Sequence, residues 1–418
     1  MVKGLAKDTY YAAVDVGTNK VCSILARVGS EGELKILGTG IAPCYGVQKG
    51  RVESIEEVKS AVMASFEESQ RYVGKGVISS VYASISGNHI SCMNTKDTLR
   101  NSEYSDGLTS DHLQALMRAS LPAIDSSKQI LHVIPMGYEV DGLSGVRNPF
   151  GLHANDVQVE AHIITGDSTI IKNTVKTIEA CKVTVNSLVS HGLASAEATL
   201  TGDEREIGSV LVDIGAGTCD IVIYKDGSPW YSSVVPVGGS QLTRDLAIAL
   251  RVPYYMAEEI KIKWGHALPE LVKADEEVVI PGVQGQPKRV IKRRGLCEPL
   301  HQRMLEILKL IMLRVSQSGL RQLPSGGLII TGGTAELQGL KALVESNLGG
   351  SVRIASPEGI AGLPSQLQKP GLSAAVGTLI WGIKHQGEGR SYRNGDNTFG
   401  YKSLLNRFNR VKERVSTR

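Results

Sequence analysis

The same short pattern occurs twice in this chain, at residues 14–21 (VDVGTNKV) and at residues 212–219 (VDIGAGTC). Each copy follows a short apolar run and is itself followed by further strand-like sequence instead of a helical pattern. After the second copy, Asp226 and Gly227 give the turn signal of a β-hairpin. The repeat therefore predicts two related strand–turn–strand units, one in each half of a duplicated α/β chain.

The hairpin context limits what the glycines of this pattern can do. In dinucleotide-binding folds and P-loops a glycine-rich turn opens a helix, whereas here it reverses one strand into the next. Glycine lets backbone N–H groups approach phosphate oxygens without a Cβ in the way. Asp15 and Asp213 can hold Mg²⁺ through water, because this ion keeps much of its hydration shell. A strand with an ordinary turn is the alternative for one copy, but two copies favour a nucleotide clamped between two domains.

A third glycine element supports that interpretation. Residues 327–335 (GLIITGGTA) read as a buried strand that runs into Gly332 and Gly333, with a helix expected to begin near Glu336. Backbone without side chains can lie against a flat adenine or an α-phosphate. Alone this element would be weak, but downstream of the two hairpins it strengthens the prediction of a nucleotide site.

Composition sets further limits on the class of protein. The 418 residues suffice for two or more domains, and no apolar run approaches the roughly 20 residues that span a bilayer. Residues 1–10 carry Lys3 and Lys7 without an apolar core after them, so we expect no secretory signal. The six cysteines are scattered singly, which predicts reduced thiols in the cytosol and no structural metal.

At the three glycine elements the chain resembles the superfamily of actin, DnaK-type chaperones and sugar kinases, and over most of its length it resembles the FtsA family. The longer similarity includes residues 79–92 (SSVYASISGNHISC), 131–135 (LHVIP), 148–152 (NPFGL) and 204–208 (EREIG). The resemblance implies an α/β, actin-like fold of two duplicated ribonuclease-H-like halves. It also implies an insert called 1C, which replaces the usual actin subdomain 1B and mediates self-association.

The resemblance gives the expected subdomain boundaries. Subdomain 1A combines residues 8–84, 165–197 and 361–384, and 1C covers 85–164. Subdomain 2A combines 198–237 with 301–360, and 2B covers 238–300. Helices are expected to begin near Tyr255 and Pro299 and to close the second half.

The resemblance also carries over the residues expected to hold ATP and Mg²⁺, with Asp15 and Asp213 facing the metal through water. They are Asp15, Gly17, Thr18, Asn19, Lys20, Asp213, Gly215, Ala216, Gly217, Thr218, Gly238, Gly239, Glu258, Lys261, Gly332 and Gly333. Glu258 and Lys261 are spaced i,i+3 on one helix face and would bracket the ribose and adenine. An exposed helical ion pair is the alternative for these two residues, and Lys263 is a competing partner.

One stretch departs from relatives that hydrolyse ATP readily. Those proteins place a carboxylate or an amide near the strand before an alanine-rich helix, where it orients the attacking water. The comparable residues 190–196 (SHGLASA) offer His191 and no carboxylate. His191 could position water, and a purely structural histidine is the alternative. We therefore expect ATP binding with slow hydrolysis or none.

The C-terminal residues differ from the rest of the chain. Residues 385–398 have no aliphatic side chain and predict a flexible linker. Residues 402–418 carry six basic side chains and one glutamate, a net charge of +5. The whole chain has a net charge of +4, so the remaining 401 residues sum to −1. This near-neutral body argues against a nucleic-acid protein.

Residues 399–418 read as an amphipathic helix for an anionic membrane surface. Its apolar stripe and basic face include Tyr401, Lys402, Leu404, Leu405, Arg407, Phe408 and Val411. A helix packed on the body, or a basic helix for RNA or calmodulin, is the alternative. Members of the FtsA family carry a membrane-targeting helix in this place, which implies a peripheral protein on the cytoplasmic face of the cell membrane at the division septum.

A second basic cluster lies in the 2B segment. It contains Lys288, Arg289, Lys292, Arg293 and Arg294. In the family, 2A and 2B receive the C-terminal peptide of the tubulin-like FtsZ, and arginines suit an acidic peptide. A solvated loop that carries its own charge is the alternative.

Three functions compete at this point. The first is an FtsA-type protein that self-associates, anchors FtsZ polymers to the membrane and recruits later division proteins. The second is a PilM-like pilus-assembly protein, whose relatives are shorter and end without a basic helix. The third is a small-molecule kinase of the same superfamily, for which the 1C stretch offers no convincing catalytic aspartate.

Overall fold

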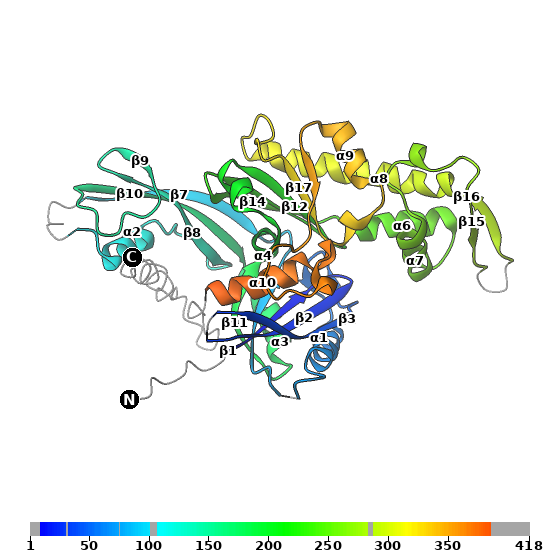
Figure 1. Cartoon of the computed structure of the whole chain (residues 1–418), viewed down its shortest axis with the longest axis horizontal. Helices are drawn as coiled ribbons and strands as arrows, with labels where there is room; N and C mark the ends of the chain where they lie inside the picture. Colours follow the sequence, from blue (N-terminus) through cyan, green and yellow to red (C-terminus); the bar gives the residue numbers. More distant parts are fainter. Residues whose placement is uncertain (1–8, 31, 75, 101–106, 283–286, 386–418) are drawn as a thin grey trace.

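The computed structural model describes residues 9–30, 32–74, 76–100, 107–282 and 287–385. Figure 1 shows an elongated molecule with two sheets near its centre, an antiparallel domain at one end and a mainly helical domain at the other. The predicted membrane helix 399–418, and the predicted linker beyond its first residue, lie outside the described residues. No helix in these described ranges is long and apolar enough to cross a membrane.

The first half is built on a five-stranded sheet in the order β3-β2-β1-β6-β11. Its strands are β1 (Thr9–Val16), β2 (Lys20–Val28), β3 (Leu34–Pro43), β6 (Ser80–Ile85) and β11 (Thr184–Ser190). The β1–β2 and β2–β3 pairs are antiparallel, and the β1–β6 and β6–β11 pairs are parallel. Both faces of this sheet are covered, which is why the central strand β1 reads as a nearly continuous apolar run.

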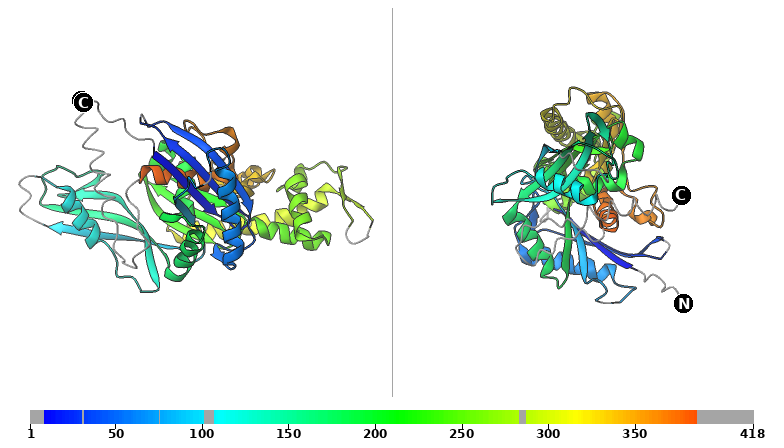
Figure 2. Two further views of the ribbon diagram at one scale, coloured as in Figure 1. Left: turned by 90° about the horizontal axis from the view of Figure 1, so that it is seen from below. Right: turned by 90° about the vertical axis from the view of Figure 1, so that its left-hand side faces the viewer.

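Four helices cover that sheet. They are α1 (Ile55–Ser69), α3 (Ser168–Glu179), α4 (His191–Thr199) and α10 (Ser373–Lys384). Figure 2 shows α1 beside β2 and β3, and the short hairpin of β4 (Val47–Gln48) and β5 (Arg51–Val52) precedes this helix.

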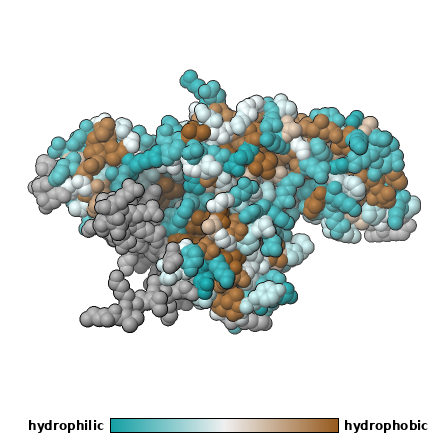
Figure 3. Space-filling model, in the orientation of Figure 1, coloured by the Kyte–Doolittle hydropathy of each residue, from teal (hydrophilic) through white to brown (hydrophobic). Residues whose placement is uncertain are grey.

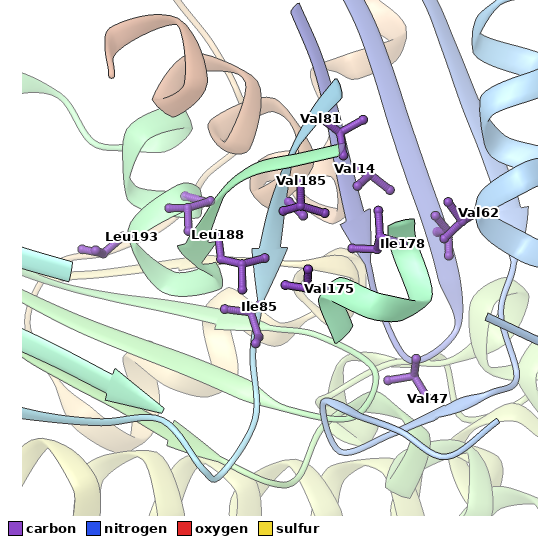
Figure 4. Packing of buried hydrophobic residues seen from close by; sticks show 14 of the residues in the cluster. Val14, Val47, Val62, Val81, Ile85, Val175, Ile178, Val185, Leu188 and Leu193 are labelled. Atoms are coloured by element: carbon purple, nitrogen blue, oxygen red, sulfur yellow. The ribbon is translucent and has the colours of Figure 1, made fainter. Parts of the chain in front are cut away.

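Apolar side chains from the sheet and from α1, α3 and α4 form one core in the first half. Figure 4 shows Val14 of β1, Val62 of α1, Ile178 of α3 and Val185 of β11 gathered in it. All of these side chains are buried, so the helices are held on the sheet mainly by apolar burial.

The second half repeats the first. Its sheet has the order β14-β13-β12-β17-β18, with antiparallel β12–β13 and β13–β14 pairs and parallel β12–β17 and β17–β18 pairs. The strands are β12 (Ser209–Ile214), β13 (Cys219–Lys225), β14 (Ser228–Val235), β17 (Leu328–Thr331) and β18 (Val352–Ile354). The same strand order and the same directions in both halves confirm the predicted duplication.

Helices and a hairpin extend the second half. They are α5 (Gly202–Glu206), α6 (Gly239–Leu250), α7 (Tyr254–Trp264), α8 (Arg293–Gln317), α9 (Leu340–Leu348), β15 (Glu277–Ile280) and β16 (Arg289–Lys292). Short 3₁₀ turns occur at Pro269–Leu271, Gly333–Glu336, Ser365–Leu367 and Pro370–Leu372. The helix start expected near Tyr255 lies one residue away, at Tyr254.

The helix start expected at Pro299 is wrong, because α8 begins at Arg293 and contains Pro299 in its interior. Proline favours the first helical turn, and that preference misplaced the boundary. The guanidinium of Arg293 bonds to Glu276, Gln338 and the carbonyl of Trp264, which fixes the earlier start.

The insert forms a domain of its own at one end of the molecule (Figure 1). Its antiparallel sheet has the order β7-β10-β8-β9, with β7 (Ser91–Arg100), β8 (Lys128–Val140), β9 (Leu143–Val146) and β10 (Asp156–Asp167). The helix α2 (Ser110–Ala119) packs on it and buries Leu113, Leu116 and Met117 in a separate core. The architecture is an actin-like fold in which this sheet domain is inserted into the first half.

Candidate functional site

A cavity of about 410 Å³ lies between the two halves. It is bounded by both predicted hairpins, by α6 and α7, and by the third glycine element. The predicted residues that line it are Asp15, Gly17, Thr18, Asn19, Lys20, His191, Asp213, Gly215, Ala216, Gly239, Glu258, Lys261, Gly332 and Gly333. The fold thus brings together in one cavity residues that are more than three hundred positions apart in the chain.

The two hairpins have the same turn. The N–H of Gly17 donates to the carbonyl of Lys20 over 2.9 Å, and the N–H of Gly215 donates to the carbonyl of Thr218 over 2.9 Å. The tips also touch, since a Cβ placed on Gly217 would lie 2.3 Å from Oγ1 of Thr18. Glycine at 217 is therefore required for the hairpins to approach each other.

Three predicted residues, Gly217, Thr218 and Gly238, do not line the cavity but lie directly behind its wall. A Cβ on Gly238 would lie 2.5 Å from the carbonyl oxygen of Gly215, so this glycine allows α6 to begin against the second hairpin. The hydroxyl of Thr218 is buried and lies 3.2 Å from the Asp220 carboxylate. These residues support the hairpin instead of facing the cavity.

The third glycine element packs against the second hairpin. Gly332 has a φ of +90°, and a Cβ there would lie 2.3 Å from Oδ1 of Asp213. Oγ1 of Thr334 donates to the carbonyl of Gly215 over 2.9 Å. The helix expected near Glu336 instead begins at Leu340, because a 3₁₀ turn over Gly333–Glu336 comes first.

Glu258 and Lys261 lie together on α7 and are largely buried. The Nζ atom of Lys261 is 2.7 Å from Oε2 of Glu258 and 2.8 Å from Oγ1 of Thr243 on α6, and the side chains of Lys261 and Glu258 are 13% and 25% exposed. An exposed helical ion pair does not describe this arrangement. Lys263, the competing residue, points over the ring of Trp264 instead.

His191 stands among three buried carboxylates. Its Nε2 lies 3.4 Å from Oδ1 of Asp15, and its Nδ1 lies 3.7 Å from Oδ2 of both Asp213 and Asp220. Burial alone would lower the pKa of His191, but the negative charges of Asp213, Asp15 and Asp220 outweigh it and raise the pKa to about 10. His191 is therefore an imidazolium at neutral pH.

The carboxylates are each held by a serine hydroxyl. Ser84 donates to Asp15 over 2.5 Å, and Ser195 donates to Asp213 over 2.5 Å. Burial raises the pKa of Asp213, whereas for Asp15 the nearby His191 overcomes the effect of burial and lowers the pKa. The two aspartates predicted to face a metal thus differ in their readiness to take up a proton.

The sequence pattern gave no role to Asp220 or Ser86. Ser86 donates to both oxygens of Asp220 over 2.8 and 2.7 Å, and burial raises the pKa of Asp220 to about 6. The residue that matches Asp220 in the first hairpin is Cys22, so the repeat did not single out this position. The stretch containing His191 offers no carboxylate of its own, but the fold supplies one from β13.

Other cavity residues were also missed. They are Leu242, Ile262, Gly265, Thr334, Glu336, Leu337, Gln338, Gly371 and Ala374. Apolar positions such as Leu242 and Leu337 follow helix or core patterns in the sequence and carry no signal that separates a cavity wall from a core.

The basic cluster of 2B is mostly used within the subdomain. Arg294 donates to the carbonyl of Val272 over 2.8 Å, and Lys292 pairs with Glu277 at 2.7 Å. Arg289 donates to the carbonyl of Leu250, and Arg293 is held as described above. These bonds leave Lys288, on the segment before β16, as the member for which the structure gives no internal role.

The comparisons with known proteins agree with this geometry. The family model described as cell division protein FtsA matches residues 210–377, and that of the SHS2 domain inserted in FtsA matches residues 87–165. Cell division protein FtsA of Pseudomonas aeruginosa is 34% identical over 380 residues, covering 90% of each chain. The Escherichia coli K12 protein of the same description is 36% identical over 377 residues, covering 88% of this chain and 89% of the relative.

Solved structures show the same fold at low sequence identity. The PilM–PilN type IV pilus biogenesis complex has a chain that superposes with a TM-score of 0.61 at 13% identity, covering 89% of this chain and 98% of its own. MreB5 of Spiroplasma citri bound to ADP superposes with a TM-score of 0.52 at 12% identity, covering 90% and 96%. Together with the sequence relatives, the duplicated halves and the inserted sheet domain, these similarities place the chain in the FtsA family of actin-like cell division proteins.

Proposed function

We propose that the chain binds ATP with Mg²⁺ in the cavity between its halves and hydrolyses it slowly or not at all. The observation that carries this proposal is the pair of identical hairpin turns, at Gly17 and at Gly215, that meet at Thr18 and Gly217. Backbone N–H groups at such turns suit phosphate oxygens. The MreB5 structure with the same fold was solved with ADP, which supports a nucleotide here.

Asp15 and Asp213 are the residues that would hold Mg²⁺, through its water shell. Both are buried at the cavity wall, and oxygen ligands are those that Mg²⁺ prefers. Within the described part of the chain, no group of three or more His, Cys, Asp and Glu side chains is arranged to hold a metal ion directly. Mg²⁺ would neutralise phosphate charge, while Lys20, at the end of the first turn, would bind a phosphate oxygen.

The nucleoside end would lie between the third glycine element and α7. Gly332 and Gly333 expose backbone to the cavity, and Glu258 and Lys261 stand on its other side. The carboxylate of Glu258 accepts hydrogen bonds from Lys261 and from the hydroxyl of Thr243, so it is oriented to accept further hydrogen bonds from ribose hydroxyls.

The carboxylates around His191 support slow hydrolysis. They raise its pKa to about 10, which opposes its use as a general base, because an imidazolium cannot take a proton from water. Burial raises the pKa of Asp213 and that of Asp220, the latter to about 6, but both carboxylates accept hydrogen bonds: Asp213 from Ser195, and Asp220 from Ser86 and Thr218. A fast steady-state ATPase that His191→Ala abolishes would contradict this part of the proposal.

We propose that in the cell this protein self-associates through its insert and tethers FtsZ polymers to the cytoplasmic face of the membrane at the septum. It would recruit later division proteins to that place. The membrane contact would be the basic amphipathic segment 399–418. Each basic residue near an anionic leaflet contributes about 1 kcal/mol, so a monomer binds reversibly and a polymer binds firmly.

The FtsZ C-terminal peptide would bind at the 2A–2B end. Figure 3 shows apolar side chains on the right-hand end of the molecule, where 2B lies, and the exposed apolar residues of this subdomain include Ile248, Val279 and Val290. Because the arginines of the basic cluster are used internally, the peptide would rely on these apolar contacts, with Lys288 as the accompanying charge. Such a mixed surface suits a short acidic and apolar peptide.

Two measurements test the proposed function. Titration calorimetry with ATP and Mg²⁺ should show binding at one site, and Asp213→Asn should weaken binding in Mg²⁺ more than in EDTA. Co-sedimentation with anionic liposomes should bring FtsZ down with the full chain but not with a chain that lacks residues 399–418. A full-length protein that leaves FtsZ in the supernatant would disprove the tether.

A further inference from the structure

The insert touches both halves of the molecule. It is joined to the first half through β6 and α3, and its strand β8 also reaches the start of α4, where Nε2 of His132 accepts from the N–H of Ser190 over 2.9 Å. His132 is buried and Ser190 directly precedes His191. The insert therefore holds the segment that carries the imidazolium of the cavity.

On its other side the insert meets β14 of the second half. His162 of β10 is completely buried, and its two ring nitrogens lie 2.7 Å from Oδ1 of Asn94 in β7 and 3.0 Å from Oγ of Ser232 in β14. Asn94 also donates to the carbonyl of Trp230 over 3.0 Å. The N–H of Ser232 donates to Sγ of Cys92 over 3.3 Å. We call these four side chains, Cys92, Asn94, His162 and Ser232, the β14 contact.

The β14 contact lies close to the second hairpin in the sheet. Ser232 is paired with Val222 in the β13–β14 ladder, and Val222 is two residues beyond Asp220 on the same strand. The edge strand β14, which the insert contacts, is thus the neighbour of β13, the second strand of that hairpin. A relative rotation of the halves must either slide β14 along the insert or carry the insert with it.

The tips of the two hairpins touch in this structure, since a Cβ on Gly217 would lie 2.3 Å from Oγ1 of Thr18. The β14 contact is formed in the same state. Two further links join the insert to the second half: Ser228 donates to the carbonyl of Met136 over 3.3 Å, and Arg147 pairs with Glu206. Touching hairpins and a docked insert are therefore seen together.

We propose that the β14 contact couples nucleotide binding to the position of the insert, so that ATP favours the docked insert and the docked insert favours ATP. The proposal rests on ATP binding in the cavity as proposed above. Coupling of this kind is reciprocal, so it can be measured as an effect of the contact on ATP affinity or as an effect of ATP on the contact. The alternative is a static packing contact that is the same with and without nucleotide.

The first test releases the contact and measures ATP affinity. Asn94→Ala combined with Ser232→Ala removes the bond from Asn94 to Trp230 and the bond between His162 and Ser232, and leaves the apolar core of the insert intact. Loss of these two hydrogen bonds, of which the one between His162 and Ser232 is buried, should weaken ATP·Mg²⁺ binding by about five- to thirtyfold. The matched control is Gln158→Ala, which removes a 3.0 Å bond to Thr98 in the same sheet away from β14 and should change affinity less than about twofold.

The second test measures the reciprocal effect with a thiol. Ser232→Cys places a second thiol beside Cys92, whose sulfur already lies 3.3 Å from the backbone of residue 232. Under mild oxidation, ATP·Mg²⁺ should speed disulfide formation between the two thiols at least threefold, and Ser232→Cys in a Cys92→Ser background should form no such bond. Mass spectrometry of peptides follows the reaction.

The outcomes separate the two proposals. If the natural chain binds no ATP, the proposed function fails. If it binds ATP while the released variant binds equally or more tightly, or the Gln158→Ala control weakens as much, the coupling is disproved and the proposed function stands. A disulfide rate that ATP does not change disproves the coupling independently of the affinity data.

Discussion

Nε2 of His191 lies 3.4 Å from Oδ1 of Asp15, and this contact joins the helix that leaves the first sheet to the first hairpin of the cavity. The same ring faces Asp213 and Asp220 from its other nitrogen. One buried cation therefore balances carboxylates contributed by both halves. Removing a partner from a buried charge cluster leaves the remaining charges uncompensated, and the cost is much larger than the net value of the intact cluster.

His191→Ala should lower the free energy of unfolding by about 3–5 kcal/mol at pH 7, measured by urea denaturation without nucleotide. The pKa of His191 is raised from 6.5 to about 10 by the carboxylates, so the stability that its charge contributes is full below pH 6.5 and is lost as pH rises toward 10. The deficit of His191→Ala should therefore be smaller at pH 9 than at pH 7. Adding Asp15→Asn should restore part of the loss. Equal stability of His191→Ala and the natural chain at pH 7 would contradict the balance of charges.

The hairpins of the cavity could be predicted because their signals are local. An apolar strand, an aspartate and glycines at a tight turn lie within a few residues, and the second copy repeats them. The strand order of both sheets agrees with that repeat. The carboxylate of Asp220 could not be given a role in this way, since its serine partner is 134 residues away and the first hairpin has Cys22 at the matching position.

The contacts of Lys261 also could not be predicted in full from local sequence. Helical spacing placed it beside Glu258, but the third member of that group, Thr243, comes from the preceding helix α6. The burial of the pair follows from the packing of α6 on α7, which no i,i+3 pattern contains. The start of α8 was misplaced for a related reason, because the bonds that hold Arg293 come from Glu276 and Gln338, remote from the helix itself.

Gly332→Ala and Gly333→Ala should differ sharply although the residues are adjacent. Gly332 has a φ of +90° and a Cβ there would lie 2.3 Å from Asp213, whereas a Cβ on Gly333 meets no atom within 4 Å. The Gly332 variant should lose at least about 2 kcal/mol of stability from backbone strain alone. The Gly333 variant should unfold like the natural chain but bind ATP more weakly, because its new methyl group enters the cavity. Thermal unfolding and titration calorimetry measure the two effects, and equal melting temperatures for both variants would refute the argument.

Lys261→Met should weaken ATP binding by about tenfold or more, since it removes the ammonium that orients Glu258 and Thr243. Lys263→Met is the matched control two residues along the same helix. That lysine stands 5.0 Å from the ring centre of Trp264 and does not line the cavity, so its loss should leave affinity within about twofold. Fluorescence titration with a labelled ATP analogue compares the variants. Comparable losses in both would show that α7 contributes general charge instead of a defined contact.

Acidification should loosen the insert through His162. Burial lowers the pKa of this histidine to about 4, against 6.5 for an ordinary histidine, so the unfolded state binds a proton that the folded state refuses. The stability that depends on a neutral ring is fully present above pH 6.5 and is lost as pH falls toward 4. Between pH 7 and pH 5 the loss should be about 2 kcal/mol. His162→Asn cannot titrate, so its unfolding free energy should fall by about 2 kcal/mol less over that range, measured by urea denaturation at each pH. If the free energies of unfolding of the two proteins fall in parallel with pH, His162 takes up its proton in the folded state. The hydrogen bonds to Asn94 and Ser232 would then not require a neutral ring.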